Sequence, residues 1–221
     1  MNPDPFVRVE FHCHTCYSSD GVTTPEELIR VCQERGIQRV VVTDHNTITG
    51  ALAAQRLDPE RVIVGEEIRT TRGELLAAFV TEEIPARLSP QETIRLLRQQ
   101  GAFISVSHPF DPFRSGWSLE DMLELVPLVD AIETYNSHCF WPGFNTQAQA
   151  FARQYGLPGT VGSDAHQPHE LGQAILRLPA FRNADELKVA IQQSRQEIIS
   201  KSIWFQLWER ISRRLRKAGS S

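Results

Sequence analysis

Histidine and acidic residues of this chain occur in pairs that can converge on a metal ion. His12 and His14 follow one apolar, β-branched segment, and Asp164 and His166 follow another. Because residues two positions apart in an extended chain point to the same side, each pair presents two ligand atoms to one point. Imidazole and carboxylate ligands together suit Zn, Mn and Fe. The spacing therefore predicts a metal centre.

The same arrangement recurs further along the chain. His45, Glu67 and His108 also stand near the ends of apolar segments. In α/β proteins the carboxyl ends of the strands form the ligand-binding face, in open sheets and closed barrels alike. A lone histidine at a strand end is usually a loop or core residue, but five of the seven histidines fall on this one face. Two ions about 3.5–4 Å apart, bridged by a carboxylate, are typical of phosphoester hydrolysis.

The elements that must position these residues alternate between strand and helix. Strands are predicted over residues 6–11, 39–43, 61–64, 75–80, 102–107, 131–135, 159–162 and 174–178. Helices are predicted after the N-caps Thr24 and Ser89, each followed by proline, and over residues 146–155 and 184–193. This alternation predicts an α/β fold with parallel strands, as an open sheet or a barrel.

The polar motifs resemble those of the PHP family, named for its polymerase and histidinol-phosphatase members. The matching segments are Phe11-His12-Cys13-His14-Thr15, Ser19-Asp20-Gly21, Thr43-Asp44-His45-Asn46, Gly65-Glu66-Glu67-Ile68, Ser107-His108-Pro109-Phe110 and Gly162-Ser163-Asp164-Ala165-His166. The resemblance covers roughly residues 7–178 and is greatest to small stand-alone members. It implies a distorted (β/α)7 barrel with up to three metal ions at the C-terminal strand ends, and hydrolysis of phosphate esters.

The resemblance also implies three groups of metal ligands. They are His12, His14, Glu67 and Asp164 for one ion, Glu67 and His108 for a second, and Asp20, His45 and His166 for a third. Many members use a further histidine in the second group, but no histidine lies between His45 and His108. We expect Glu74 to replace it, since a carboxylate can also ligate; the alternative is a solvated turn residue. Glu67, Asp164 and His166 are the expected catalytic residues.

Three further residues are candidates for substrate binding. Arg114 lies in the loop after His108, where a planar guanidinium would suit phosphate. Asn136 follows a predicted strand, and His138 lies two residues further on. For Arg114 and His138 the alternative is a solvated loop residue.

The composition indicates the number of domains and the cellular location of the protein. The chain has 221 residues, of which 41% are hydrophobic and 23% charged, as expected for one globular domain. No apolar run approaches the ~20 residues that span a bilayer, and the N-terminal residues lack a secretory apolar segment. We therefore expect a cytoplasmic protein. The formal charge of −4 argues against general polyanion binding by the whole chain.

The last residues differ in composition from the rest. We expect a PHP-type phosphoesterase domain over residues 1–199 and a basic amphipathic helix and tail over residues 200–221. Trp204 and Trp208 fall at helical spacing, with arginines mostly on the opposite face. Nucleic acid or anionic lipid is a candidate partner for this segment. We favour packing of the tryptophans on the domain.

The function expected from these patterns is metal-dependent hydrolysis of phosphate esters. Two or three divalent ions (Mn, Fe or Zn) would hold a hydroxide that attacks phosphorus. The substrate would be a small phosphorylated molecule, with nucleotides among the candidates. Two alternatives stay open: a nuclease acting on nucleic-acid ends, and a metal-binding regulatory module without turnover. No P-loop, G-x-S-x-G or G-x-G-x-x-G motif occurs, so other hydrolase and cofactor chemistries have no support.

Overall fold

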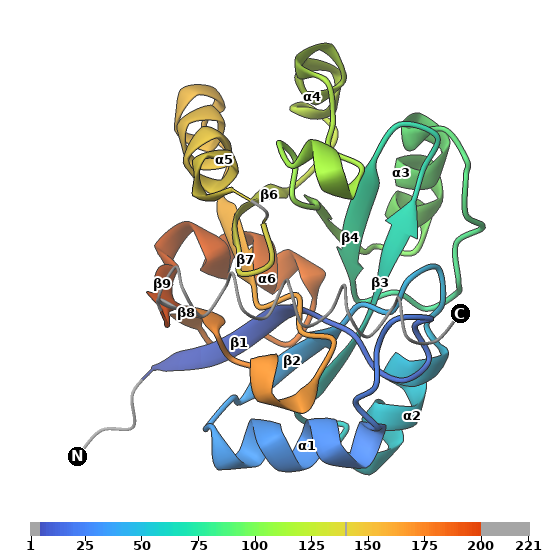
Figure 1. Cartoon of the computed structure of the whole chain (residues 1–221), viewed down its shortest axis with the longest axis vertical. Coiled ribbons are helices and arrows are strands. Elements are labelled where there is room, and N and C mark those ends of the chain that lie inside the picture. Colours follow the sequence, from blue (N-terminus) through green and yellow to red (C-terminus); the bar gives the residue numbers. More distant parts are fainter. Residues whose placement is uncertain (1–4, 140, 200–221) are drawn as a thin grey trace, which may run out of the picture.

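The computed structural model describes residues 5–139 and 141–199, which form one nine-stranded sheet surrounded by helices (Figure 1). The sheet order is β7-β6-β5-β4-β3-β2-β1-β8-β9. The strands are β1 (Phe6–Cys13), β2 (Arg39–Val42), β3 (Val62–Arg69), β4 (Glu74–Ala78), β5 (Phe103–Val106), β6 (Ala131–Asn136), β7 (Gly159–Gly162), β8 (Ala174–Pro179) and β9 (Arg195–Ile198). The helices are α1 (Pro25–Glu34), α2 (Thr49–Leu57), α3 (Pro90–Gln99), α4 (Leu119–Leu125), α5 (Pro142–Tyr155) and α6 (Ala184–Ala190), with short 3-10 turns η1 (Pro112–Arg114), η2 (Pro168–Glu170) and η3 (Ile191–Gln193).

The sheet curls into a nearly closed barrel because β1 has different neighbours along its length. Its first residues pair antiparallel with β8. Its last residues reach β7, where the Asp164 N–H donates to the His12 carbonyl at 2.7 Å and the His14 N–H donates to the Ala165 carbonyl at 2.8 Å. The buried Glu10 carboxylate spans this junction, accepting the N–H groups of Ser163 and Gly172, each at 2.9 Å. The two contacts at the end of β1 bring β1 and β7 together at the mouth.

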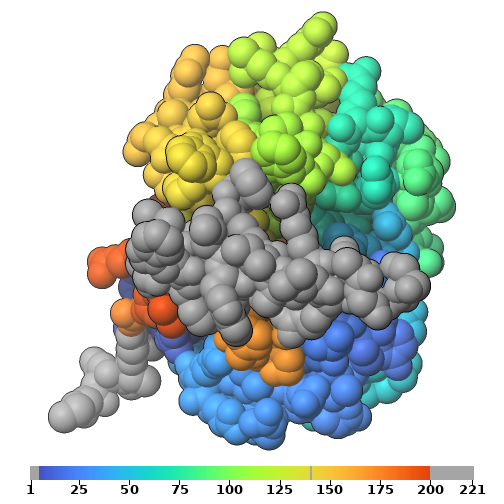
Figure 2. Space-filling view, viewed as in Figure 1, coloured from blue at the N-terminus to red at the C-terminus, as the bar shows by residue number. Residues whose placement is uncertain are grey.

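Apolar residues on both faces of the strands explain why helices surround the sheet. Val40 and Val42 of β2 belong to one buried cluster, and Val41 belongs to a second cluster that also contains Leu187 of α6. A strand buried on both faces is typical of a sheet covered by helices. In Figures 1 and 2, α1 and α2 lie at one end of the molecule and the segments of α4 and α5 lie at the other.

The caps predicted from the sequence form in the structure. Thr24 accepts the Glu27 N–H at 3.2 Å, and the Glu27 carboxylate accepts the Thr24 N–H at 3.3 Å, so α1 begins with a complete capping box. Ser89 likewise accepts the Glu92 N–H at 3.2 Å at the start of α3. Asn183 caps α6, which begins at residue 184 as predicted, by accepting the Glu186 N–H at 2.9 Å.

The sheet is parallel in part, as expected: β1, β2 and β3 run parallel, and so do β5, β6 and β7, whereas the other pairs are antiparallel. β4 is antiparallel to both β3 and β5, and β8 is antiparallel to both β1 and β9. Only residues 70–73 separate β3 from β4, and a parallel connection needs a dozen or more residues, so the two strands form a hairpin. The mixed α/β barrel is present, but this hairpin replaces one strand–helix unit.

Other differences concern element bounds. β3 continues through Glu67 to Arg69 instead of ending at Val64. α5 begins at Pro142, four residues before the predicted start, and α2, α4 and β9 had no separate prediction. The predicted helix over residues 200–221 lies outside the described residues.

Candidate metal centre

Four ligand atoms from three separated strands meet at the barrel mouth. His12 and His14 stand at the end of β1, Glu67 in β3 and Asp164 just after β7. The two Nε2 atoms lie 3.2 Å apart, and each lies 3.2–3.5 Å from Glu67 Oε2 and Asp164 Oδ1. Ligands bound at about 2.0–2.2 Å to a tetrahedral ion lie about 3.3–3.6 Å from one another. These five distances fall in or within 0.1 Å of that range, and His12, His14 and Asp164 together can hold an ion.

The same two carboxylate oxygens are the ones that lack other partners. Glu67 Oε2 and Asp164 Oδ1 are buried, and neither has a hydrogen-bond partner among the described residues. Leaving a buried carboxylate oxygen unsatisfied is costly, so such an atom calls for a cation or a donor. Both oxygens point to the place where a cation would complete the group.

The other Glu67 oxygen faces a second group. Glu67 Oε1 lies 3.2 Å from His108 Nε2 and accepts the Ser107 hydroxyl at 2.7 Å. Glu74 Oε2 lies 3.5 Å from the same His108 nitrogen. Glu67, Glu74 and His108 together can hold an ion. Glu74 is the first residue of β4 and is 9% exposed, so it is not the solvated turn residue of the alternative interpretation.

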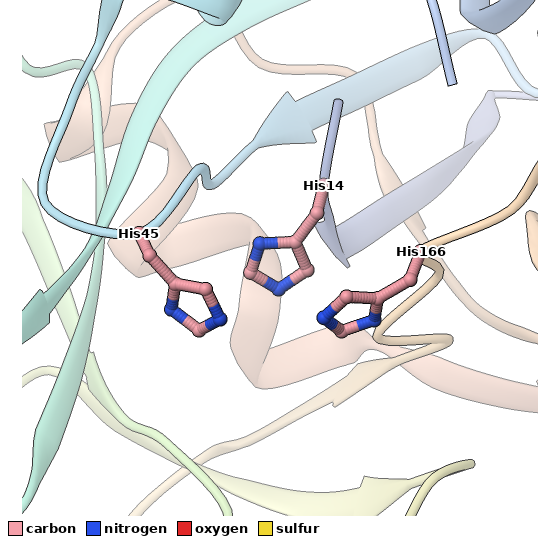
Figure 3. A group of neighbouring side chains, drawn as sticks. All are labelled: His14, His45 and His166. Carbon is pink, nitrogen blue, oxygen red and sulfur yellow. The ribbon is translucent and has the colours of Figure 1, made fainter. Parts of the chain in front are cut away.

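A third group lies nearer the opening of the mouth. His45 and His166 approach Asp20 Oδ2 at 3.6 and 3.4 Å through their Nε2 atoms. Figure 3 shows the His14 ring between those of His45 and His166, with ring centroids 4.4 and 4.3 Å away. These three histidines come from the ends of β1, β2 and β7, and they can also hold an ion.

The charges within the cluster suit metal ligation. Burial alone would raise the pKa of Glu67, but His12 and His45 hold it well below its usual range. Burial and the neighbouring His166 lower the pKa of His14 to about 3, so this imidazole is neutral. Burial would lower the pKa of His12, but Asp164 and Glu67 hold it well above its usual value. A cation bound here would therefore displace the His12 proton.

The predicted substrate residues also lie at the mouth. The Arg114 guanidinium forms an ion pair with Asp164 and donates to Asn136 Oδ1 at 3.2 Å. The Asn136 amide donates to Asp164 Oδ2 at 2.9 Å and accepts the His138 N–H at 2.8 Å. All polar atoms of the Asn136 side chain are thus engaged within the chain, which favours a positioning role for this residue.

His138 packs beside the third group. Its ring stacks on His166 with centroids 5.6 Å apart, and its Nε2 lies 3.4 Å from the buried Glu170 carboxylate. Glu170 also accepts the N–H groups of His166 and Gln167 at 2.9 and 3.1 Å. This carboxylate therefore fixes both the loop after β7 and the His138 side chain.

Sequence reasoning missed Glu133, a buried acid in β6. Its Oε1 lies 2.9 Å from His12 Nδ1, and its Oε2 accepts the His108 N–H at 2.9 Å and the Asn136 amide at 3.0 Å. A carboxylate on the far nitrogen of a ligating histidine fixes the tautomer and orients the ring. The signal in the sequence was a single acid within an apolar strand.

Glu66 precedes Glu67 in β3 and faces away from it, because neighbouring residues of a strand point to opposite faces. It is fully buried and accepts the Ile84 N–H at 3.1 Å. Burial raises the pKa of this carboxyl to about 8. Asp44, the other acid in these motifs, accepts the N–H and hydroxyl of Thr15 and the hydroxyl of Ser18, so it orients the loop after β1.

Comparisons with known proteins identify the family. Residues 10–100 match the model of the PHP domain, and residues 142–195 match the model described as PHP-associated. An uncharacterized protein of Methanocaldococcus jannaschii is 34% identical over 145 residues, which are 60% of this chain and 83% of that protein. The chain belongs to the PHP family.

Solved structures share the PHP fold. A two-domain Bacteroides vulgatus protein, described as containing a predicted PHP-like metal-dependent phosphoesterase, matches with a TM-score of 0.70 and 20% identity. The match covers 87% of this chain and 65% of that one. The lesion-specific endonuclease EndoQ of Pyrococcus furiosus matches with a TM-score of 0.61 and 16% identity over 86% of this chain and 57% of its own. At these identities the likeness establishes the fold alone.

The donors found at the mouth fit the metal ions that PHP phosphoesterases require. Histidine nitrogens and carboxylate oxygens suit Zn, Mn and Fe, and the unsatisfied buried oxygens of Glu67 and Asp164 lie among them. Among the described residues, no helix has the length and apolar character needed to cross a membrane.

Proposed function

We propose that this PHP protein hydrolyses phosphate esters with two or three divalent metal ions. The observation that carries the proposal is the group of four ligand atoms with unsatisfied buried carboxylate oxygens. Bound divalent ions lower the pKa of water and offset the charge of phosphoryl oxygens, so no protein nucleophile is required. Zn, Mn and Fe all suit the donors.

The residues of the chain have separate tasks in this proposal. Glu67 and Asp164 hold ions and carry the charge that attracts them, and His166 holds an ion next to Asp20. Glu74 completes the second group in place of the histidine that many family members use. The proposal is supported by the positions of these side chains at one mouth and by the ionised state of Glu67 and Asp164, whose pKa values lie well below the usual range despite burial.

Arg114 and His138 are the proposed substrate contacts. Arg114 already faces a carboxylate oxygen of Asp164. A phosphoryl oxygen entering the mouth offers the guanidinium a second anionic acceptor of suitable geometry. His138 stands next to His166, where its ring can donate a hydrogen bond to the substrate.

The experiment is a phosphoester panel on metal-reconstituted protein. It contains phosphomonoesters, nucleoside bisphosphates, cyclic nucleotides and short oligonucleotides, with Asp164→Asn as the variant that removes a ligand charge. We expect turnover of small phosphate esters by the wild type and a loss of orders of magnitude in the variant. Full metal loading with no turnover of any member would favour a regulatory module instead.

A nuclease acting on nucleic-acid ends is the second candidate. Its support is the fold shared with the EndoQ endonuclease and the basic composition of residues 200–217. Turnover of oligonucleotides alone in the same panel would favour it over the small-molecule esterase.

A further inference from the structure

Exposed apolar side chains stand on two loops at the mouth of the barrel. Tyr17 and Val22 lie on the loop after β1, and Trp141 ends the loop after β6; together they make up the apolar rim of the mouth. Their side chains are between 48% and 63% exposed. The Val22 N–H donates to the His166 carbonyl at 2.9 Å, so the rim adjoins the third ligand group. Exposed apolar side chains beside a site are typical of a surface that another segment or molecule covers.

The described part of the chain ends on this same side of the barrel. β1 runs toward the mouth, β8 is antiparallel to β1, and β9 is antiparallel to β8, so β9 also runs toward the mouth. The Ile199 N–H donates to the Gln173 carbonyl at 2.8 Å, and the Gln173 N–H donates to the Glu170 carbonyl at 3.3 Å. The Glu170 carboxylate accepts the His166 N–H at 2.9 Å. Ile199 is therefore linked through two residues to the third ligand group.

The sequence after Ile199 has the apolar content and the length to cover the rim. Apolar residues of this segment at the spacing of one helix face are Trp204, Leu207, Trp208, Ile211 and Leu215. In a helix, the 18 residues of 200–217 would span about 27 Å, which is close to the diameter of a small domain. A segment of this length that starts beside Ile199 can reach across the mouth.

The charge of this segment is opposite to that of the rest of the chain. Residues 200–217 carry six basic residues and one acidic residue, which leaves 17 basic and 26 acidic residues elsewhere. Acids at the mouth include Asp20, whose side chain is 42% exposed, and the buried Glu67 and Glu170. Opposite charges favour contact between the segment and the mouth. An anionic membrane would attract the segment but repel the acidic remainder of the chain.

We infer that residues 200–217 dock on the apolar rim and cover the opening of the metal centre, with Trp204 and Trp208 as the anchors. Tryptophan buries a large apolar area and often anchors contacts between surfaces. Such a cover slows the exchange of ions and water between the mouth and the solvent. The inference goes beyond the proposed phosphoesterase function and does not depend on it, because docking requires neither metal nor substrate.

Cys16 provides a natural reporter at the rim. It precedes Tyr17 in the loop after β1 and is exposed, whereas Cys13, Cys32 and Cys139 are buried. A bulky maleimide should therefore modify Cys16 first, at a rate that is lower when the rim is covered. Peptide mass spectrometry identifies the modified cysteine. The measurement uses the full chain without added metal, so its result is independent of turnover.

The test variant is Trp204→Ala/Trp208→Ala, and the control is Gln206→Ala, which at helical spacing falls on the opposite face. We expect equal rates of Cys16 modification in the wild type and the control. The rate in the test variant should be about tenfold higher or more, because loss of both anchors favours the uncovered state. Equal rates in all three proteins would overturn the inference.

A second variant removes charge and leaves the tryptophans in place. Arg213→Gln/Arg214→Gln weakens the attraction between the segment and the acidic mouth, so Cys16 should again react faster than in the wild type, by a smaller factor. Thermal unfolding checks that each variant keeps the melting midpoint of the wild type. If the tryptophan variant does not fold, the arginine variant decides, and a wild-type rate in it would overturn the inference.

Two further arms test other occupants of the tryptophan face. If Cys16 reacts equally in the wild type and the test variant, while only the wild type binds phosphatidylserine vesicles, the segment serves a membrane surface and the inference is overturned. Docking within one chain predicts a wild-type rate that is independent of protein concentration. A rate that falls as the concentration rises would assign the covering segment to a second copy and would also overturn the inference.

Discussion

At the scale of single residues, Glu67 is the carboxylate on which the ligand groups converge. Its Oε2 lies 3.0 Å from His45 Nδ1 and within 3.4 Å of the His12 and His14 nitrogens, while its Oε1 faces His108. Asp164 completes the first group from the opposite side of β1. Both acids are fully buried, so water screens their attraction for a cation less than it would at the surface.

The first prediction concerns these two acids. Glu67→Gln and Asp164→Asn keep the side-chain size but remove the charge that holds cations, so each should lower turnover by orders of magnitude. Circular dichroism should show a folded chain, and elemental analysis should show fewer bound ions. The control is Glu124→Gln on α4. A variant that keeps full metal content and wild-type turnover would remove that residue from the site.

The second prediction concerns Glu74. If it is a direct ligand of the second ion, Glu74→Ala should yield protein with one ion fewer, and Glu74→His should restore the count. Loss of indirect support alone typically lowers metal affinity ~10–100-fold, so loss of a ligand should be at least as severe. Elemental analysis after dialysis gives the count. Wild-type metal content in Glu74→Ala would refute the assignment.

The third prediction concerns Glu133, which touches no proposed ion. Glu133→Gln leaves the ligand set intact but weakens the hydrogen bond that orients His12. We expect metal affinity to fall about 10–100-fold, with the number of ions at saturation unchanged. Competition with a chelator measures this. A drop in the saturating number instead would indicate that Glu133 is itself a ligand.

Paired motifs made the histidines and Asp164 predictable, whereas Glu133 was not. A His-x-His pair converges by strand geometry alone, so its role is visible in the sequence. Glu133 reaches His12 only because the barrel brings β6 close to β1, although the two residues lie 121 positions apart. Such a contact depends on the closed fold. The sequence shows only one acidic residue within an apolar strand.

At the scale of elements, the end of β7 packs closely against the proposed metal ligands. A Cβ atom added at Gly162 would overlap the Cβ of His12 and lie 2.6 Å from Glu133 Oε1. Glycine is therefore the residue that lets β7 approach β1. Asp164 follows this strand after one residue, so the close approach also sets the position of a proposed metal ligand.

The fourth prediction follows from that packing. Gly162→Ala should lower the free energy of unfolding by about 1–3 kcal/mol through overpacking, and should weaken metal binding by displacing His12. Gly101→Ala is the comparison, because nothing lies within 4 Å of an added Cβ there and only its φ of +73° opposes the change. Denaturant unfolding and metal titration measure the two effects. Unchanged metal affinity in Gly162→Ala would contradict the argument.

Element positions were largely predictable, but strand direction was not. Caps and apolar runs located all eight predicted strands and the starts of α1, α3 and α6. The direction of β4 was missed because a strand buried on both faces has the same apolar pattern whether it is parallel or antiparallel. The feature that indicates an antiparallel β4 is the connection between β3 and β4, which is too short for a helical crossover.

At the scale of the whole molecule, the proposed metal ligands come from segments that are distant in the sequence. His14, Glu67 and Asp164 come from β1, β3 and the loop after β7, and β1 and β7 meet at the point where the barrel closes. An ion bound by all three would link both sides of that junction. Metal loading should therefore stabilise the fold as well as the site.

The fifth prediction is that chelation lowers the melting temperature. A ligand that binds only the folded state stabilises it by about 2.7 kcal/mol at a free concentration of 100 Kd. A stability change of 1 kcal/mol shifts the Tm of a domain of this size by about 2–4 °C. Removal of the metal should therefore lower Tm by about 5–10 °C. Calorimetry with and without chelator measures the shift. Identical melting curves for loaded and stripped protein would show that the ions do not link the strands.

The sharing of Glu67 between groups has a consequence for how ions enter. Its two oxygens belong to one delocalised charge, so a cation on Oε2 draws electron density away from Oε1, which faces His108. The second ion then meets a weaker ligand and the repulsion of the first. We therefore expect the ions to bind in order and not independently, with each stepwise association constant smaller than the one before. In a cell poor in metal, the protein would then be present mainly in a one-ion form.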